Sequence, residues 1–416
     1  MGESGRSAGR AQGILLLAVL AAIVSQQVLV PVLAPLSREV GLTPVELGLV
    51  MTVAAGLFAV TSLFWGRVVD RWGHRRVLLA GLTTAGLGLT GFALVSQAAL
   101  AGTLSPGATL AGMIATRSVV FGIGLGAVPT AAMALIAART APGPERTAGI
   151  GRLGAVQGVA VALGPALGAL LAFAGLLGPV WLAPVAVLVS IAVVAVGVRP
   201  APAAPPAPGP AAPPPRPVRP WDAGMWPVLL TGFLVMLSLG LVLIVLGFLV
   251  QDRLGLDAAG TVRVSGAMSF LSGVALVLMQ GVAVPRLGWP PVRLLRVGLP
   301  IATAGLLLLA VAPGVLTIGL AMTLLAAGLG LAMPGYTTAA TLQAGPEGQG
   351  GVAGLVNATN GSTFVIGPLA GTALYTLGTG VPAFVAAVAC LLGVLLAVLH
   401  PALRSARPDP AATVAP

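Results

Sequence analysis

The sequence carries very little charge. Only 7% of its 416 residues are charged, whereas 57% are hydrophobic, and the mean hydropathy is +1.04. So few charged side chains cannot cover the surface of a water-soluble fold, and this composition therefore excludes a soluble enzyme. The apolar runs that recur along the chain are instead long enough to cross a lipid bilayer.

Metal-ligating and nucleophilic side chains are also scarce. The chain has one cysteine, Cys390, within an apolar run, and two histidines. A single cysteine cannot form an intrachain disulfide, and this set is too small for a thiolate metal site. Since no nucleophile, base and acid form a recognisable constellation, we expect neither an enzyme nor a bound cofactor or metal.

Acidic residues are missing from the middle of every expected span. The ten acidic residues lie at the ends of the apolar runs or between them. Proton-driven carriers commonly use a buried carboxylate that binds and releases a proton. Coupling to protons would therefore have to use Asp70, a residue near a helix end, or the charge of the substrate itself. Such a cavity favours neutral lipophilic or anionic compounds over organic cations.

The apolar runs predict an all-α membrane protein with twelve transmembrane helices, since about 20 residues span the hydrocarbon core. The expected spans are 13–34, 45–66, 77–97, 109–137, 149–174, 178–198, 224–250, 262–284, 292–312, 314–340, 351–376 and 380–399. The formal net charge of +11 comes from arginines at the ends of these spans, so we do not expect a nucleic acid partner.

The distribution of arginine predicts the orientation in the membrane. The loops expected outside the cell carry only Arg38, Arg253 and Arg263, and almost all other arginines fall on the opposite side. Because basic residues concentrate on cytoplasmic loops, both termini are expected in the cytoplasm and the protein in the inner (plasma) membrane.

A stretch rich in proline and alanine separates two halves of the chain. Residues 199–220 cannot form a membrane helix, and a proline-rich chain of this length is an extended linker. We therefore predict an N-terminal bundle of six helices over 1–198, a cytoplasmic linker over 199–220, and a C-terminal bundle of six helices with a short tail over 221–416.

The two halves are similar to each other in sequence. The segment 164–168 (GPALG) recurs as 367–371 (GPLAG), and Gly122-Ile-Gly124 recurs as Gly328-Leu-Gly330. The segment 66–73 has a weaker counterpart in 281–288. Three matches in the same order predict parallel repeats, an arrangement that supports alternating access around a site at the membrane midplane.

The segment 66–76 (GRVVDRWGHRR) joins the second and third expected spans as a short cationic hairpin, with glycines that permit a sharp turn. It resembles the loop 2-3 signature of the major facilitator superfamily, and with the two halves and the linker this resemblance covers nearly the whole chain. The matching residues are Gly66, Asp70, Arg71, Gly73, Arg75 and Arg76. The resemblance implies that Asp70 and the arginines form a cytoplasmic charge cluster that holds an outward-facing state. The arginines can equally be plain topology anchors.

The fifth expected span resembles the Gly-Pro signature of the drug:proton antiporter branch of this superfamily. Gly164, Pro165 and Gly168 match that signature, whereas Ala160 and Ala169 stand where the branch has glycine. Proline frees a backbone carbonyl and glycine permits close helix contact, so the segment either bends and seals one side of the pore or forms a structural kink.

Arg117 is the one ionisable residue expected well inside a span. An intramembrane charge costs several kcal/mol and marks a functional candidate. Arg117 resembles the fourth-helix arginine of the antiporters, but five positions separate it from Gly122 where the branch has four. It is expected to face the cavity and bind substrate or take part in coupling, or else to pair with an outer acid such as Glu39, Glu46 or Asp252.

Neutral polar side chains supply the remaining substrate or coupling candidates. Each of them can contact a substrate or form a hydrogen bond between helices. They are Gln26, Gln27, Gln157, Gln280, Tyr336, Asn357 and Asn360.

These observations predict a secondary active transporter that moves small molecules by alternating access, with efflux of drug-like compounds or metabolites as the expected activity. An importer or facilitator of a small anion, with Arg117 as countercharge, is the first alternative. A non-transporting receptor or assembly factor is the second. Expected partners are a small-molecule substrate, the lipid bilayer and protons as coupling ion, and the chain is expected to be a monomer.

Overall fold

The structure is a computed structural model that describes residues 3–139, 144–197, 219–344 and 349–404. In these ranges the chain forms helices and no strands. Among the described residues, eleven helical segments are long and apolar enough to cross a membrane. This is the result expected in lipid, where a helix satisfies its own backbone hydrogen bonds.

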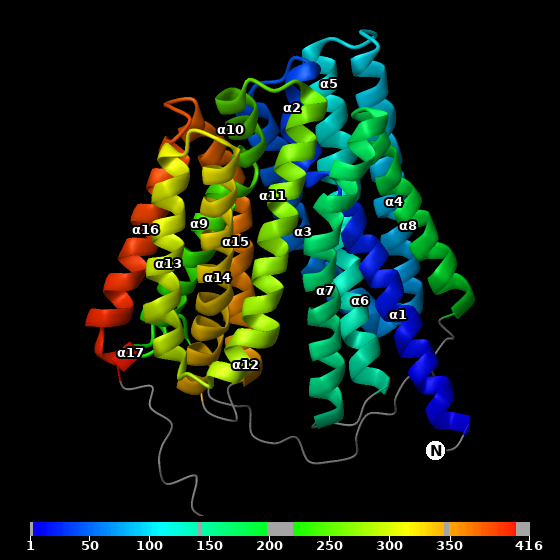
Figure 1. The fold of residues 1–416 in the computed structure, drawn as a ribbon. Coiled ribbons are helices and arrows are strands. Elements are labelled where there is room, and N and C mark those ends of the chain that lie inside the picture. Colours follow the sequence, from blue (N-terminus) through cyan, green and yellow to red (C-terminus); the bar gives the residue numbers. More distant parts are fainter. Residues whose placement is uncertain (1–2, 140–143, 198–218, 345–348, 405–416) are drawn as a thin grey trace, which may run out of the picture. The chain divides into compact units, whose positions relative to one another are not determined.

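The chain divides into two compact units. Unit 1 comprises Met1–Pro208 with Ile244–Gly273, and unit 2 comprises Gly209–Leu243 with Val274–Pro416. Unit 1 contains α1 (Glu3–Gln27), α2 (Val30–Glu39), α3 (Pro44–Trp72), α4 (His74–Leu100), α5 (Pro106–Met113), the π-helical turn η1 (Ile114–Val120), α6 (Phe121–Arg139), α7 (Pro144–Leu171), the 3-10 turn η2 (Ala172–Ala174), α8 (Leu177–Gly197), α10 (Val245–Leu254) and most of α11 (Ala258–Leu278). In this unit α1 lies beside α7 and α8, and α6 packs against α3 and α4 (Figure 1).

Unit 2 is also built of packed helices. It contains α9 (Trp226–Leu243), the end of α11, the π-helical turn η3 (Met279–Ala283), α12 (Val284–Leu287), α13 (Pro291–Val311), α14 (Val315–Ala344), α15 (Gln349–Tyr375), α16 (Val381–Leu399) and α17 (Pro401–Arg404). Here α13 packs against α14 and α16, and α9 packs against α15 and α16.

The structure differs from the expected spans at three places. The expected span 351–376 forms the helix α15. Its polar residues lower its mean hydropathy, so it is not one of the eleven segments apolar enough to cross a membrane. The span 13–34 is interrupted between α1 and α2, where Pro31 lacks the N–H that a continuous helix needs. The span 224–250 is interrupted at Ile244. This residue is also the first of the segment Ile244–Gly273, which belongs to unit 1, whereas the residues just before it belong to unit 2. The linker predicted at 199–220 lies almost wholly outside the described residues.

The expected hairpin at 66–76 proves to be two helix ends. α3 continues to Trp72 and α4 begins at His74, so Gly73 alone makes the turn. Its φ of 77° lies in the left-handed region, which glycine adopts without strain. Gly66 lies inside α3 and does not form a turn.

Corresponding glycines in the two halves make corresponding helix contacts. In unit 1, Gly164 of α7 faces Gln27 and Gly168 faces the carbonyl of Val28 in the first expected span. In unit 2, Gly367 of α15 faces Gly240 of α9, and Gly371 faces the carbonyl of Leu241. Glycine permits this close approach because a Cβ would collide with the facing backbone. The GPALG and GPLAG segments therefore have the same packing role.

A second pair of contacts corrects one of the sequence matches. Gly124 of α6 packs against Gly81 and Ala85 of α4, and Gly328 of α14 makes the same contact with Gly298 and Ala302 of α13. By packing, Gly124 is therefore the counterpart of Gly328. The predicted match of Gly122 with Gly328 was wrong by two residues.

Candidate functional site

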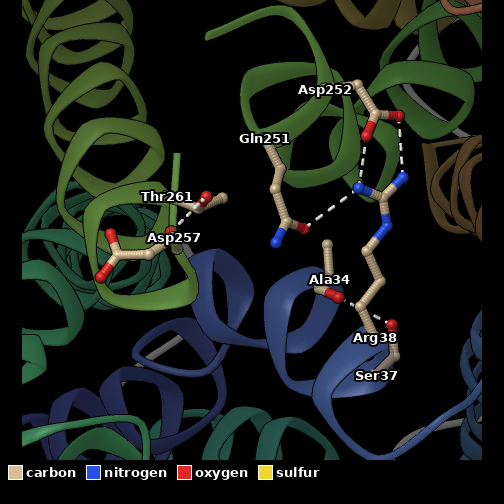
Figure 2. Close-up of polar contacts among 7 residues, drawn as sticks. All are labelled: Ala34, Ser37, Arg38, Gln251, Asp252, Asp257 and Thr261. Atoms are coloured by element: carbon tan, nitrogen blue, oxygen red, sulfur yellow. Dashed lines mark hydrogen bonds and ion pairs between the residues drawn. The ribbon is translucent and has the colours of Figure 1, made fainter. Parts of the chain in front are cut away.

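A cluster of polar side chains joins the end of α2 to the end of α10 in unit 1. The Arg38 guanidinium forms a two-pronged ion pair with Asp252, in which Nη2 donates to Oδ2 at 2.7 Å (Figure 2). Nη1 also donates to Gln251 Oε1 at 3.3 Å. The side chains of Arg38 and Asp252 are 30% and 33% exposed, so water screens the pair and limits its contribution to stability.

Close apolar packing lies next to this ion pair. The Arg38 guanidinium stacks over the Phe248 ring at 5.1 Å from its centroid, and Phe248 is fully buried. A Cβ built at Gly247 would lie 2.6 Å from Ala34 Cβ, so α2 and α10 approach as closely as glycine allows. Residues from the first and second halves of the chain therefore join at this end of unit 1.

Sequence reasoning did not identify this pair, although a signal was present. Arg38 and Asp252 are 214 positions apart, which is within the spacing range of the matches between the two halves. A search for opposite charges at corresponding positions of the two repeats would have identified Arg38 and Asp252 as a candidate pair.

Arg117 lies in η1, buried in unit 1. Its side chain is 2% exposed, the guanidinium stacks over the Phe121 ring at 4.4 Å, and Nε has no hydrogen-bond partner. Within the described ranges no carboxylate forms an ion pair with it. The expected pairing with an outer acid is not observed, because Asp252 binds Arg38 and Glu46 caps α3 through Thr43. The structure thus contains a buried cation without an anion.

The π-helical turn explains the unusual spacing between Arg117 and Gly122. The Phe121 N–H donates to the Thr116 carbonyl, five positions earlier instead of the four of an α-helix. A π-helical turn absorbs one additional residue while the helix continues on either side. The extra position before Gly122 therefore does not rotate Arg117 to the opposite face of α6.

The charged residues at the α3–α4 junction have different environments. Arg75 Nη2 donates to the Ala195 carbonyl near the end of α8 at 2.8 Å, and Arg296 Nε makes the corresponding bond to the Ala397 carbonyl near the end of α16 at 3.0 Å. A cation at a helix carboxyl end is stabilising. Asp70, Arg71 and Arg76 are exposed, and none of the three pairs with a described residue.

The remaining polar candidates are dispersed. In unit 1, Gln26, Gln27 and Gln157 are half-buried on α1 and α7, next to the buried Gly164, Pro165 and Gly168. In unit 2, the Tyr336 hydroxyl donates to Asn360 Oδ1 between α14 and α15. The other two candidates are exposed: Gln280 lies in η3, where Nε2 is 3.8 Å from Met333 Sδ, and Asn357 lies on α15.

The chain resembles known membrane transporters in sequence and fold. Residues 15–368 match the sequence family described as the Major Facilitator Superfamily. The crystal structure of the human organic anion transporter MFSD10 (TETRAN) aligns with a TM-score of 0.64 at 20% identity, covering 94% of this chain and 99% of that one. A bacterial homolog of the human lysosomal transporter Spinster, inward-facing and occupied, aligns with a TM-score of 0.70 at 14% identity, covering 96% and 98%. No curated protein sequence matches the chain.

Proposed function

Because the chain belongs to the major facilitator superfamily, we propose that it carries small organic anions across the inner membrane by alternating access, with Arg117 as the countercharge. The family and its transporter folds make the chain a multi-pass membrane transporter and not an enzyme. Small organic anions as substrates, the inner membrane as the location, and the cytoplasmic placement of both termini are proposed here.

The buried guanidinium of Arg117 is the observation that carries this proposal. A cation with no anionic partner costs several kcal/mol inside a membrane protein, and a bound anion offsets that cost. No described carboxylate lies in the middle of a span, so an organic cation would find no countercharge in the described spans. One structural neighbour is described as an organic anion transporter, but its 20% identity supports the fold alone.

Two sets of charged residues are proposed to control access to the substrate site, one from each side of the membrane. The Arg38–Asp252 pair lies at the end of unit 1 that the arginine distribution predicts to be outside the cell. Asp70, Arg71 and Arg76 lie at the opposite, cytoplasmic end of α3 and α4, where the family resemblance assigns a charge cluster. The two sets of charges engage in alternate states of the transport cycle.

Counterflow in proteoliposomes tests the assignment of Arg117. The probes are naphthalene-1-sulfonate, a permanent anion, and its neutral analogue naphthalene-1-sulfonamide. Wild type should exchange the sulfonate saturably, and Arg117→Ala should lower that exchange at least tenfold, while Arg117→Lys keeps part of it. Arg293→Ala, which removes an exposed arginine stacked on Trp289, is the matched control.

Sulfonate exchange by Arg117→Ala at the wild-type rate would refute the proposal, as would the absence of sulfonate exchange in wild type. Folding can be checked separately. Since an unpaired buried charge is unfavourable, Arg117→Met should unfold at the same or a higher temperature than wild type.

Proton-driven efflux of neutral, drug-like compounds is the second candidate. The observation that favours it is the packing of Gly164 and Gly168 on the first expected span, since these glycines belong to the segment that resembles the antiporter signature. Efflux of a neutral dye that collapses when an uncoupler removes the proton gradient, and that Arg117→Ala leaves unchanged, would favour this candidate over anion transport.

A further inference from the structure

The π-helical turn η1 packs against two glycines of α4. A Cβ built at Gly88 would lie 2.5 Å from the Phe121 nitrogen and 2.8 Å from the Thr116 carbonyl oxygen, the two atoms that form the wide hydrogen bond of the turn. A Cβ at Gly91 would lie 2.7 Å from Thr116 Cγ2. Non-bonded atoms do not approach this closely, so any larger residue at position 88 would displace the backbone of the turn.

The turn is fixed on its other side by α3. The Ser118 hydroxyl donates to the Val50 carbonyl at 2.6 Å, and this bond is fully buried. The Thr116 hydroxyl also donates to the Gly112 carbonyl at 2.7 Å, within the same helix. The residues on either side of Arg117 are therefore held by different neighbouring helices, Thr116 by α4 and Ser118 by α3.

This arrangement determines where the Arg117 guanidinium lies. With both flanking residues fixed, the backbone at position 117 cannot rotate, and the side chain is left over the Phe121 ring with Nε unpartnered. We propose that Gly88 and Gly91 are positioning residues for substrate recognition: they accommodate the π-helical turn, and the turn directs Arg117 toward an anionic group of the substrate. This inference rests on the proposed function of Arg117.

Close helix packing alone does not account for the turn. In unit 2, Gly305 of α13 makes the same kind of contact with α14, a regular α-helix, where a built Cβ would lie 2.6 Å from the Leu325 nitrogen and 2.8 Å from the Ala321 oxygen. The π-helical turn in unit 1 is therefore not a requirement of a glycine contact between these helices. π-helical turns of this kind are frequent at functional sites, and here the turn contains the one buried cation of the described spans.

A pair of glycine variants separates positioning from packing. Gly81→Ala is the matched control, because Gly81 also faces backbone of α6, with the Gly124 oxygen 2.9 Å from a built Cβ, but lies away from η1. Both Gly88→Ala and Gly81→Ala should lower the unfolding temperature of the full chain in lipid nanodiscs. Only Gly88→Ala should raise the dissociation constant for naphthalene-1-sulfonate, at least tenfold. If Gly88→Ala does not fold, Gly91→Ala replaces it, since its contact is with a side-chain methyl group.

A deletion tests the turn itself, with sulfonate binding as the measurement. Removal of Ala115 takes the additional residue out of η1 and should leave a regular α-helix. The deletion alone should raise the dissociation constant for naphthalene-1-sulfonate at least tenfold, and Gly88→Ala should then raise it no further. Wild-type affinity in the deletion variant, or equal affinity in Gly88→Ala and Gly81→Ala, would overturn the inference. Wild-type sulfonate affinity in Arg117→Ala would instead refute the proposed function.

Discussion

At the scale of single residues, buried polar groups distinguish the two units. Unit 1 holds an unpaired cation at Arg117, and unit 2 holds a neutral hydrogen-bonded pair, Tyr336 with Asn360. In a membrane, groups that satisfy each other contribute to stability, whereas an unsatisfied charge lowers it. Only the cation is therefore a strong candidate for binding an oppositely charged group.

A double-mutant cycle measures the pair in unit 2. Tyr336→Phe and Asn360→Ala each remove the hydrogen bond, so the double variant should lose less stability than the sum of the two. Hydrogen bonds between membrane helices contribute about 0.6 kcal/mol on average, and we expect a coupling of this size. Reversible denaturation in mixed micelles gives the four free energies of unfolding, for wild type, the two single variants and the double variant. Strictly additive losses would show that the two side chains do not interact.

The position of Arg117 inside a span could be predicted from the sequence, but its orientation could not. An arginine inside an apolar run is visible in any hydropathy profile. Whether it faces Gly122 or the opposite side depends on one backbone hydrogen bond, from Phe121 to Thr116, and local sequence does not specify a π-helical turn. The packing of Gly88 against that turn is a contact between two helices, so the sequence around Gly88 does not predict it either.

At the scale of helices, the Arg38–Asp252 ion pair joins the end of α2 to the end of α10. Arg38→Asp or Asp252→Arg alone should lower the free energy of unfolding in reversible denaturation, and the charge-swapped double variant should restore it. An exposed pair contributes up to about 1 kcal/mol, which corresponds to roughly a fivefold change in an equilibrium.

Arg263→Glu serves as the control for this experiment, because Arg263 stacks on Phe173 and not on an acid. A free energy of unfolding that is insensitive to both single charge reversals would mean that packing around Gly247 and Phe248 alone holds the two helices together.

Helix positions followed from apolarity, whereas helix ends did not. The expected span 77–97 and the observed α4, His74–Leu100, agree in the middle and differ at both ends. Arginines can extend a helix beyond the apolar core, so charge does not mark where a helix stops. The turn at Gly73 depends on a positive φ at a single residue, and the sequence contains 58 glycines, most of which do not turn the chain.

At the scale of the whole molecule, the repeated segments were visible in the sequence, whereas the division into six-helix bundles at 199–220 stays a prediction. The two compact units have other bounds, since unit 1 also includes Ile244–Gly273. The GPALG and GPLAG segments make matching contacts in the two units. The register of the Gly122 match was wrong because glycines recur at short intervals in both helices, and only their contacts with α4 and α13 fix the alignment. Arg38 and Asp252 illustrate the same limit, since a repeat spacing suggests a partner but does not prove contact.

The orientation in the membrane gives a further prediction. In a Cys390→Ala background, a cysteine at the exposed Trp72 should react with an impermeant maleimide only after the cells are opened. A cysteine at the exposed Asp257 should react in intact cells. The physical reason is the concentration of arginine on the side of Trp72. The reverse pattern of labelling would invert the topology, and with it the assignment of the Arg38–Asp252 pair to the outer side.

The polarity of α15 has a consequence for how the protein is made. Its middle carries Asn357, Asn360, Ser362 and Thr363, and it is absent from the eleven segments apolar enough to span a membrane alone. A nascent helix of this composition partitions weakly from the translocon into lipid. In the structure α15 packs chiefly against α9, which precedes it in the chain. We therefore expect α15 to enter the bilayer only by binding α9, so a change that removes α9 should leave α15 outside the membrane during synthesis.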